Sequence, residues 1–219
     1  MKRILLFALI ASHLLTSCGS ISSFESPNSL RNIDGTLFLR NGKTYEGKLL
    51  IESTEVFGRP VKIFTEGDTR PMQFNLDEVE GYRIQSDRYD LREVKGGLRI
   101  GKELSFMKRL TPEASRIHLY EYLKKVNEST KGYTAIKTRY ERELCIQMPN
   151  EGLAVYPSRS SRFVPNFDEK MSRLVNDCPS LANKIAAKED GYFYAQVGLV
   201  KENRATVLMA IIDEYNRCK

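Results

Sequence analysis

Short runs of alternating hydrophobic and polar residues, separated by turn residues, fill the chain between residues 35 and 156. Such alternation predicts β-strands that each bury one face. Within residues 35–51 the pair Asn41-Gly42 joins two of these runs, which predicts a hairpin with a two-residue type I′ turn. Further strands are predicted at 61–65, 72–74, 82–85, 89–94, 104–110, 117–123, 133–140, 143–148 and 153–156.

Two local patterns add detail to this strand prediction. In residues 117–123 the two alternating sets of side chains carry aliphatic groups and aromatic rings respectively, which predicts a central strand covered on both faces. Residues 75–79 predict a single helical turn, with Asn75 as its N-cap and Glu78 three positions later. The stretch Lys-Gly-Gly at 95–97 predicts a break between two β-rich blocks.

After Pro165 the spacing of hydrophobic residues changes to about 3.6, which predicts helices. Asn166 is the predicted N-cap of the first helix, Pro179 begins a short second helix, and the last helix covers residues 197–216. The residues predicted to line one face of these helices are Phe167, Met171, Leu174, Val175, Leu181, Ile185, Val200, Arg204, Val207, Leu208, Ile211, Ile212 and Tyr215.

Together these elements predict an α+β fold. A small antiparallel block, built like a barrel or a sandwich, is expected over residues 34–94. A β-meander closed by a C-terminal helical segment is expected over residues 98–219.

The first eighteen residues have the layout of a bacterial lipoprotein signal. Lys2 and Arg3 precede an apolar stretch that is too short to span a bilayer, and Leu-Thr-Ser-Cys at 15–18 looks like a lipobox. We therefore expect residues 1–17 to be removed and Cys18 to be lipidated, since two or three acyl chains anchor a protein firmly. The alternative is an ordinary secretory signal with Cys18 as an incidental thiol.

The residues that follow Cys18 predict where the mature protein lies. Gly19 in place of Asp favours the outer membrane over the inner one, by the sorting rules of lipoproteins. The periplasmic side is preferred to the cell surface. Residues 18–33 are rich in Ser, Asn and Pro, so they predict a tether between the lipid and the first folded block.

The charge of the chain is mildly positive, and the signs are mixed. The formal net charge of +6 falls to +4 when Lys2 and Arg3 are removed with the signal. Stretches such as residues 139–143 alternate in sign, which is typical of a solvated surface. Because nucleic-acid-binding proteins gather Lys and Arg on one face or arm, we expect no nucleic-acid partner.

With Cys18 lipidated, Cys145, Cys178 and Cys218 remain for an oxidising compartment, where three thiols allow one disulfide. Cys178 and Cys218 bracket the predicted helical segment, so we pair them; the bridge would contribute roughly 3–5 kcal/mol. Cys145 lies in an apolar strand and is expected to be buried.

Several stretches are shared with other proteins: Lys-Thr-Tyr-Glu-Gly (43–47) after the Asn-Gly pair, Gly-Tyr-Arg-Ile (81–84), Phe-Met-Lys-Arg-Leu (106–110) ahead of 117–122, Asp-Cys-Pro (177–179) and Tyr-Asn-Arg-Cys (215–218). Together they resemble a group of uncharacterised bacterial envelope lipoproteins. The resemblance covers most of the mature chain and supports the pairing of Cys178 with Cys218. It implies no activity.

The inventory of reactive residues argues against catalysis and predicts no cofactor and no metal. His118 is the one histidine outside the signal, no Gly-x-Ser-x-Gly elbow presents a serine, and a zinc site lacks ligands. No glycine-rich phosphate loop is present. Asp77, Glu78 and Glu80 could supply paired carboxylates for glycoside hydrolysis, but a solvated helical turn explains them better.

We therefore expect a lipid-anchored, non-enzymatic envelope protein that serves as an interaction or accessory module for another envelope protein. The alternative is a glycan-binding or hydrolytic envelope protein whose ligand site contains His118, Tyr120, Glu121 and Tyr122. A deep cleft that gathers His118, Tyr120 and Glu121 would favour this alternative. A third possibility is a scaffold that touches peptidoglycan.

Overall fold

The computed structural model describes residues 22–53, 59–95, 103–129, 136–194 and 203–218. Its described helices are α2 (Phe167–Leu174), α3 (Pro179–Ala186) and α4 (Asn203–Arg217). Its described strands are β1 (Ser23–Ser26), β2 (Ser29–Leu39), β3 (Thr44–Ile51), β4 (Val61–Phe64), β5 (Met72–Phe74), β6 (Val79–Ile84), β7 (Asp87–Val94), β8 (Glu103–Arg109), β9 (His118–Ser129), β10 (Ile136–Gln147) and β11 (Ala154–Pro157). The α+β prediction is confirmed.

The two predicted β-rich blocks share one sheet. Its strand order is β11-β10-β9-β8-β7-β6-β2-β3-β4-β5, with β1 paired to β2. The neighbours in this order are antiparallel, but β11 also pairs with β7 in parallel. Two hydrogen bonds of 2.9 Å, from Glu93 N to Leu153 O and from Lys95 N to Val155 O, extend this pairing. Strands β7 to β11 therefore form a closed ring of hydrogen-bonded neighbours.

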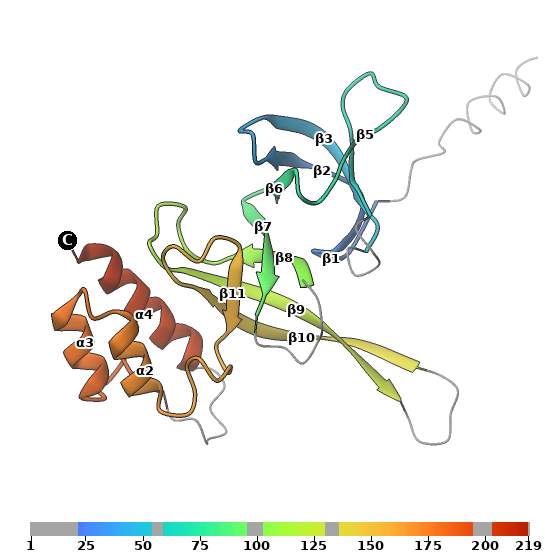
Figure 1. Ribbon diagram of the computed structural model, residues 1–219. Coiled ribbons are helices and arrows are strands. Elements are labelled where there is room, and N and C mark those ends of the chain that lie inside the picture. Colours follow the sequence, from blue (N-terminus) through green and yellow to red (C-terminus); the bar gives the residue numbers. More distant parts are fainter. Residues whose placement is uncertain (1–21, 54–58, 96–102, 130–135, 195–202, 219) are drawn as a thin grey trace, which may run out of the picture.

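A first hydrophobic core lies inside the N-terminal strands, where the sheet curls around its own side chains and the described helices do not cover it (Figure 1). Tyr82 is fully buried at its centre and contacts the rings of Tyr89 and Phe106. Because both of these rings come from β7 and β8, the first core continues into the second half of the sheet. Its buried members are Leu30, Leu37, Leu39, Leu49, Ile51, Val61, Ile63, Leu76, Val79, Tyr82, Tyr89, Leu91 and Phe106.

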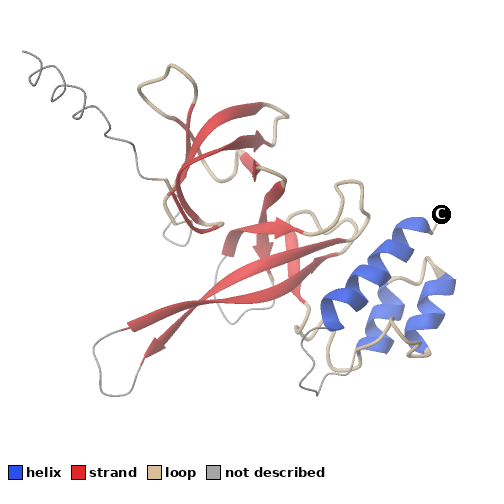
Figure 2. Ribbon diagram, turned by 180° about the vertical axis from the view of Figure 1, so that it is seen from behind, coloured by secondary structure: helices blue, strands red, loops and turns tan. Residues whose placement is uncertain are grey.

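A second core lies between the sheet and the three C-terminal helices, which Figure 2 shows together at one end of the molecule. Leu119 of β9 and Ile146 of β10 face Phe167, Leu208 and other apolar residues of the helices. The neighbouring Tyr120 is buried on the opposite face of β9, inside the ring. The prediction of a central strand at 117–123 is thus confirmed, because β9 lies between β8 and β10 with both faces covered.

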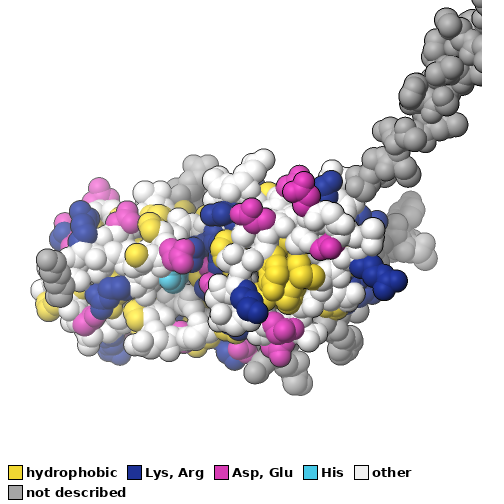
Figure 3. Space-filling view, turned by 90° about the horizontal axis from the view of Figure 1, so that it is seen from above, with side chains coloured by type: hydrophobic (Ala, Val, Ile, Leu, Met, Phe, Trp, Pro, Cys, Tyr) yellow, Lys and Arg dark blue, Asp and Glu magenta, His cyan; other side chains and the backbone are white. Residues whose placement is uncertain are grey.

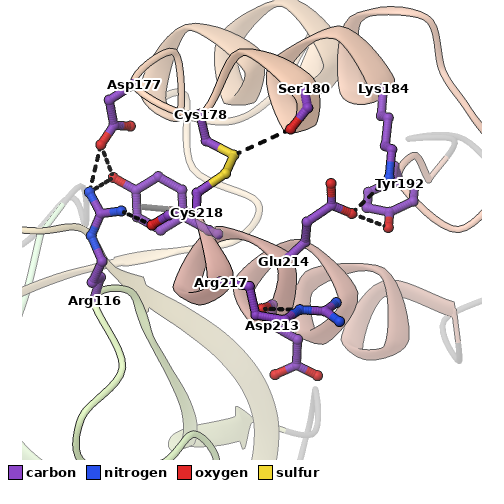
Figure 4. The surroundings of a disulfide bond; sticks show 11 residues. Arg116, Asp177, Cys178, Ser180, Lys184, Tyr192, Asp213, Glu214, Arg217 and Cys218 are labelled. Atoms are coloured by element: carbon purple, nitrogen blue, oxygen red, sulfur yellow. Dashed lines mark hydrogen bonds and ion pairs between the residues drawn. A yellow bond between two sulfur atoms is a disulfide. The ribbon is translucent and has the colours of Figure 1, made fainter.

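A disulfide and a polar cluster hold the C-terminal helix in place (Figure 4). Cys178, at the start of α3, is bonded to Cys218 after α4, with 5.8 Å between their Cα atoms, so the predicted pairing is confirmed. Beside it, Arg116 binds Asp177 at 2.6 Å, and the Tyr215 hydroxyl donates to the same carboxylate at 2.9 Å. The loop before β9 is therefore tied to the last helix.

The hairpin at the Asn-Gly pair is confirmed, but its turn type differs from the prediction. Only Gly42 has a positive φ, of 81°, whereas a type I′ turn requires positive φ at both central residues. Gly42 N donates to Leu39 O and Leu39 N donates to Lys43 O. These bonds define a longer loop, in which a type I turn is followed by a left-handed glycine.

The predicted tether over residues 18–33 is wrong from Ser23 onward, because β1 and most of β2 lie within it. The reason is a set of long-range hydrogen bonds made by its polar residues. The Asn28 side chain donates to Ser105 Oγ at 2.8 Å and accepts from Phe106 N at 2.7 Å. Asn28 thus acts as an additional partner of β8, which local composition does not reveal.

Strands β9 and β10 extend further than predicted and form a projecting arm. The two strands predicted at 133–140 and 143–148 are one strand, β10, which pairs with β9 from Gln147 to Ile136. The pairing of β8 with β9 includes nothing beyond Glu121, and that of β11 with β10 reaches Cys145. We call the outer part of this hairpin, residues 124–129 and 136–142, the β9–β10 arm (Figure 1).

The helix predictions are confirmed in position and corrected in detail. Asn166 precedes α2, but its side chain makes no cap hydrogen bond, because its backbone is left-handed with φ 65°. Pro179 is the first residue of α3, as predicted. The predicted start of the last helix at residue 197 lies outside the described residues. At the turn over residues 75–79, Asn75 N donates to Glu78 Oε2 at 2.8 Å, as expected for the pair.

Candidate functional site

The ring of strands β7 to β11 encloses a polar interior. Strand register decides which side chains enter it, because alternate residues point to opposite faces. The pairing of Asp90 with Met107, of Arg109 with Tyr120 and of Tyr120 with Cys145 places these residues on one face. The residues on this inner face are Arg88, Asp90, Arg92, Met107, Arg109, His118, Tyr120, Tyr122, Cys145, Gln147 and Val155.

Asp90 of β7 is the centre of this interior, and its side chain has no exposed surface. Its carboxylate lies 2.7 Å from Arg88 Nε, 3.2 Å from Arg92 Nη2 and 3.4 Å from Arg109 Nη1. A buried charge is tolerated when opposite charges and hydrogen bonds compensate for its lost hydration. Asp90 therefore holds three guanidinium groups from two adjacent strands together, at one point in the ring.

Tyr120 extends the Asp90 cluster across the ring to β10. Arg92 Nε donates to the Tyr120 hydroxyl at 2.9 Å, and that hydroxyl lies 3.2 Å from Asp90 Oδ2 and 3.1 Å from Gln147 Oε1. The Gln147 amide in turn donates to Gly152 O. Burial raises the pKa of Tyr120 well above its ordinary value, so the phenol stays protonated and acts as a structural link.

His118 lies at the edge of this network, half-buried, with its Nδ1 3.2 Å from Thr111 Oγ1. Burial lowers the pKa of His118, and the positive charges of Arg109 and Arg92 lower it further. The carboxylates of Asp90 and Glu113 oppose this shift without overcoming it. The imidazole is therefore neutral at pH 7.

The lowered pKa of His118 predicts a pH dependence of stability. The unfolded chain takes up the proton near the ordinary pKa of 6.5, whereas the folded chain takes it up at lower pH. Stability is thus expected to fall as the pH drops below about 6.5, and to fall less in His118→Gln. Urea unfolding of both proteins at pH 7.5 and 5.0 measures this. Equal losses in the two proteins would show that His118 is not responsible.

A groove of about 420 Å³ opens above the Asp90 cluster, between the β2–β3 hairpin and the loop after β8. Arg88 and Arg109 line it, and both also contact Asp90 below. The Arg88 guanidinium lies 3.8 Å from the centroid of the Phe38 ring. We call this the arginine groove; its lining residues are Phe38, Glu80, Arg83, Ser86, Asp87, Arg88, Arg109, Thr111, Pro112 and Glu113.

The acidic residues of the arginine groove are paired with cations. Glu80 lies 2.9 Å from Arg88, Glu113 lies 3.3 Å from Arg109, and Asp87 lies 2.7 Å from Lys108 outside the groove. Arg83 is exposed and lies 5.7 Å from the Phe38 centroid. Figure 3 likewise shows acidic and basic side chains interspersed on the face it presents.

The residues suggested by the sequence as a ligand site do not converge. Glu121 lies opposite Lys108 and Leu144 in the register, on the outer face of β9, whereas His118 and Tyr120 lie on the inner face. A cleft that gathers all three is therefore ruled out by the alternation of the strand. Tyr122 is buried in the ring beside Cys145.

The acidic group at residues 77–80 does not form a carboxylate pair either. Glu78 accepts a hydrogen bond from Asn75 N, and Glu80 binds Arg88. Sequence reasoning missed Asp90 itself. The signal was the alternation of Arg88, Asp90 and Arg92, which places three charged residues on one face of a strand.

The cysteines outside the disulfide have separate positions. Cys145 is free and fully buried, as predicted, and burial raises the pKa of its thiol well above the ordinary value. This places it among inert structural cysteines. Cys18 lies outside the described residues.

Within the described residues, no group of three or more His, Cys, Asp or Glu side chains is placed to hold a metal ion. Of the helices that the structure describes, none has both the length and the apolar character needed to cross a membrane. A scan against protein-family models, a search of characterised proteins and a search of solved structures each find no match.

Proposed function

We propose that this chain is a lipid-anchored, non-enzymatic protein of the cell envelope that contacts another envelope protein through the arginine groove. The observation that carries the proposal is the groove itself, in which Arg88 and Arg109 are fixed from below by the buried Asp90. On this view the N-terminal strands act as a small barrel-like block that presents one wall of the groove.

The side chains of the groove suit protein recognition. Arginine and aromatic residues are enriched at interface cores and at hot spots, and here Arg88 is stacked on Phe38. Because Arg88 and Arg109 are already held in place, little rotamer entropy remains to be lost when a partner binds. Guanidinium groups recognise carboxylates through two parallel hydrogen bonds, so an acidic segment of the partner is the expected ligand, with exposed Arg83 as its first contact.

A catalytic role finds less support in the same residues. Both oxygens of Asp90 contact arginines, and the Tyr120 hydroxyl is buried within the cluster. The glycan-binding or hydrolytic alternative relied on His118, Tyr120 and Glu121 acting together, and these lie on opposite faces of β9. We therefore do not pursue that alternative.

The lipid anchor is tested by the mass of the native protein. Protein extracted from membranes with detergent is expected to begin at Cys18 and to carry two or three acyl chains, as measured by intact-mass spectrometry. Cys18→Ser is expected to remain unprocessed at this site. A mature mass that corresponds to unmodified Cys18 would contradict the anchor.

The partner is tested by cross-linking in intact cells. A photo-reactive amino acid in place of Arg83 is expected to capture one envelope protein in stoichiometric yield, identified after detergent recovery. The same probe at Arg173, an exposed residue of α2, is the matched control and is expected to capture none. If the protein is recovered alone from the Arg83 position, with its anchor and disulfide intact, the partner proposal loses its support.

A further inference from the structure

The distance between the proposed anchor and the folded body is short. Strand β1 begins at Ser23, so only residues 18–22 separate it from a lipidated Cys18. A chain spans at most about 3.5 Å per residue, which limits this connection to roughly 17 Å. The inference developed below rests on the proposed anchor, because that anchor would hold β1 close to the lipid headgroups.

The base of the β9–β10 arm lies directly beside β1. The Tyr140 hydroxyl of β10 donates to Glu25 Oε1 of β1 at 3.2 Å. Whatever surface β1 approaches is therefore also approached by the arm. The loop before β9 and the arm lie at opposite ends of β9, so the arginine groove, which contains Thr111 and Glu113 of that loop, lies away from the arm (Figure 1).

The arm carries the excess positive charge of the protein. Residues 124–142 contain six Lys or Arg and two Glu, a net charge of +4, which equals that of the mature chain. The remainder of the mature chain is thus balanced. The exposed cations among the described residues of the arm are Lys124, Lys125, Arg139 and Arg142.

A cationic cavity continues from the base of the arm onto the body. It measures about 300 Å³ and is lined by four cations, two of them on the arm, and two carboxylates. Its charged lining residues are Lys124, Arg142, Arg159, Arg204, Glu141 and Glu143. The size and net positive charge suit a phosphate group.

Strand β1 adds an apolar contact to this charged surface. Phe24 is 45% exposed, and it is the one large hydrophobic side chain classed as exposed among the described residues. It lies in β1, six positions after Cys18 in the sequence. Exposed aromatic side chains next to cations are typical of surfaces that lie at a lipid interface.

We propose that the β9–β10 arm and β1 lie on the membrane surface and bind the headgroups of anionic phospholipids. Acyl chains at Cys18 would supply the insertion, and Lys124, Lys125 and Arg142 would bind lipid phosphates. The arm thereby sets the orientation of the protein, with the arginine groove directed away from the bilayer toward its partner. An acidic protein is the other class of surface that this arm could meet.

Vesicle binding of a chain without lipid tests the proposal. The mature chain with Cys18→Ser is mixed with vesicles of phosphatidylcholine alone, or with 30% phosphatidylglycerol, and sedimented. Binding is expected to the anionic vesicles only, and to weaken with salt. Each cation near such a surface is worth roughly fivefold in affinity, so Lys124→Gln, Lys125→Gln and Arg142→Gln together are expected to weaken binding about 100-fold.

A second triple variant controls for the loss of net charge. Arg40→Gln, Lys43→Gln and Arg173→Gln remove the same number of exposed cations outside the arm, and this variant is expected to bind like the parent chain. Circular dichroism shows whether both variants are folded. Equal weakening in the two variants, or equal binding to both kinds of vesicle, overturns the proposal.

The vesicle assay is independent of the two tests of the proposed function. It needs neither an acylated Cys18 nor the partner captured from Arg83. A parent chain that binds neither vesicle, while a probe at Lys125 captures an acidic protein in cells, assigns the arm to that protein and overturns the lipid proposal. A vesicle-binding chain without acylation would instead refute the anchor alone.

Discussion

Replacing Asp90 by asparagine lowers the free energy of unfolding by about 3–5 kcal/mol, the range found when one partner of a buried ion pair is removed. Asparagine has nearly the same shape, so packing changes little. It carries no charge, however, and Arg88, Arg92 and Arg109 would then face one another around a neutral amide. Chemical unfolding of the mature chain measures the loss.

Asp87→Asn is the matched control, because Asp87 is in the same strand and also binds a cation, Lys108, at 2.7 Å. Its side chain is 42% exposed, so the loss should stay within about 1 kcal/mol. Tyr120→Phe removes one hydroxyl from the same cluster and should cost about 1 kcal/mol or slightly more. If Asp90→Asn and Asp87→Asn were equally destabilising, the cluster would not be the organising centre described above.

Loss of the Cys178–Cys218 disulfide is expected to reduce the free energy of unfolding by about 4 kcal/mol in the chain-entropy model. The bridged residues are 40 apart in the sequence, so the closed loop removes considerable freedom from the unfolded chain. The double variant Cys178→Ser, Cys218→Ser should unfold at lower denaturant concentration than the oxidised parent chain.

The reducing agent itself provides the control for this experiment. Dithiothreitol should lower the stability of the parent chain to that of the double variant, and should leave the double variant unchanged. Cys145 is buried and free in both proteins, so it does not contribute to the difference. A parent chain whose unfolding is unaffected by dithiothreitol would contradict the stabilising role of the bridge.

Local sequence patterns predicted the elements well, since alternation and turn residues act over a few positions. The hairpin at Asn41-Gly42, the central strand at 117–123 and the start of α3 at Pro179 are all present. The cysteine pairing was also predictable, because few thiols were available. These features depend on neighbours in the sequence or on simple counting.

The features that the sequence did not reveal depend on distant contacts. Asn28 belongs to a stretch with the composition of a linker, yet its partners Ser105 and Phe106 are more than 70 residues away. Asp90 alternates with arginines as the residues of an exposed strand face do, and it is buried because β11 closes the ring over this face. No window of local sequence contains both strands of that closure.

The parallel pairing of β11 with β7 sets an order for folding. Val94 meets Val155 only after three intervening strands have been synthesised and paired, so the closing contact pays the loop-closure entropy of a long segment. Until then β7 and β10 each present an open edge, and such edges recruit strands from other molecules. A chain that is truncated or cleaved before Ala154 would therefore be left with two adhesive edges, and aggregation during export is its expected fate.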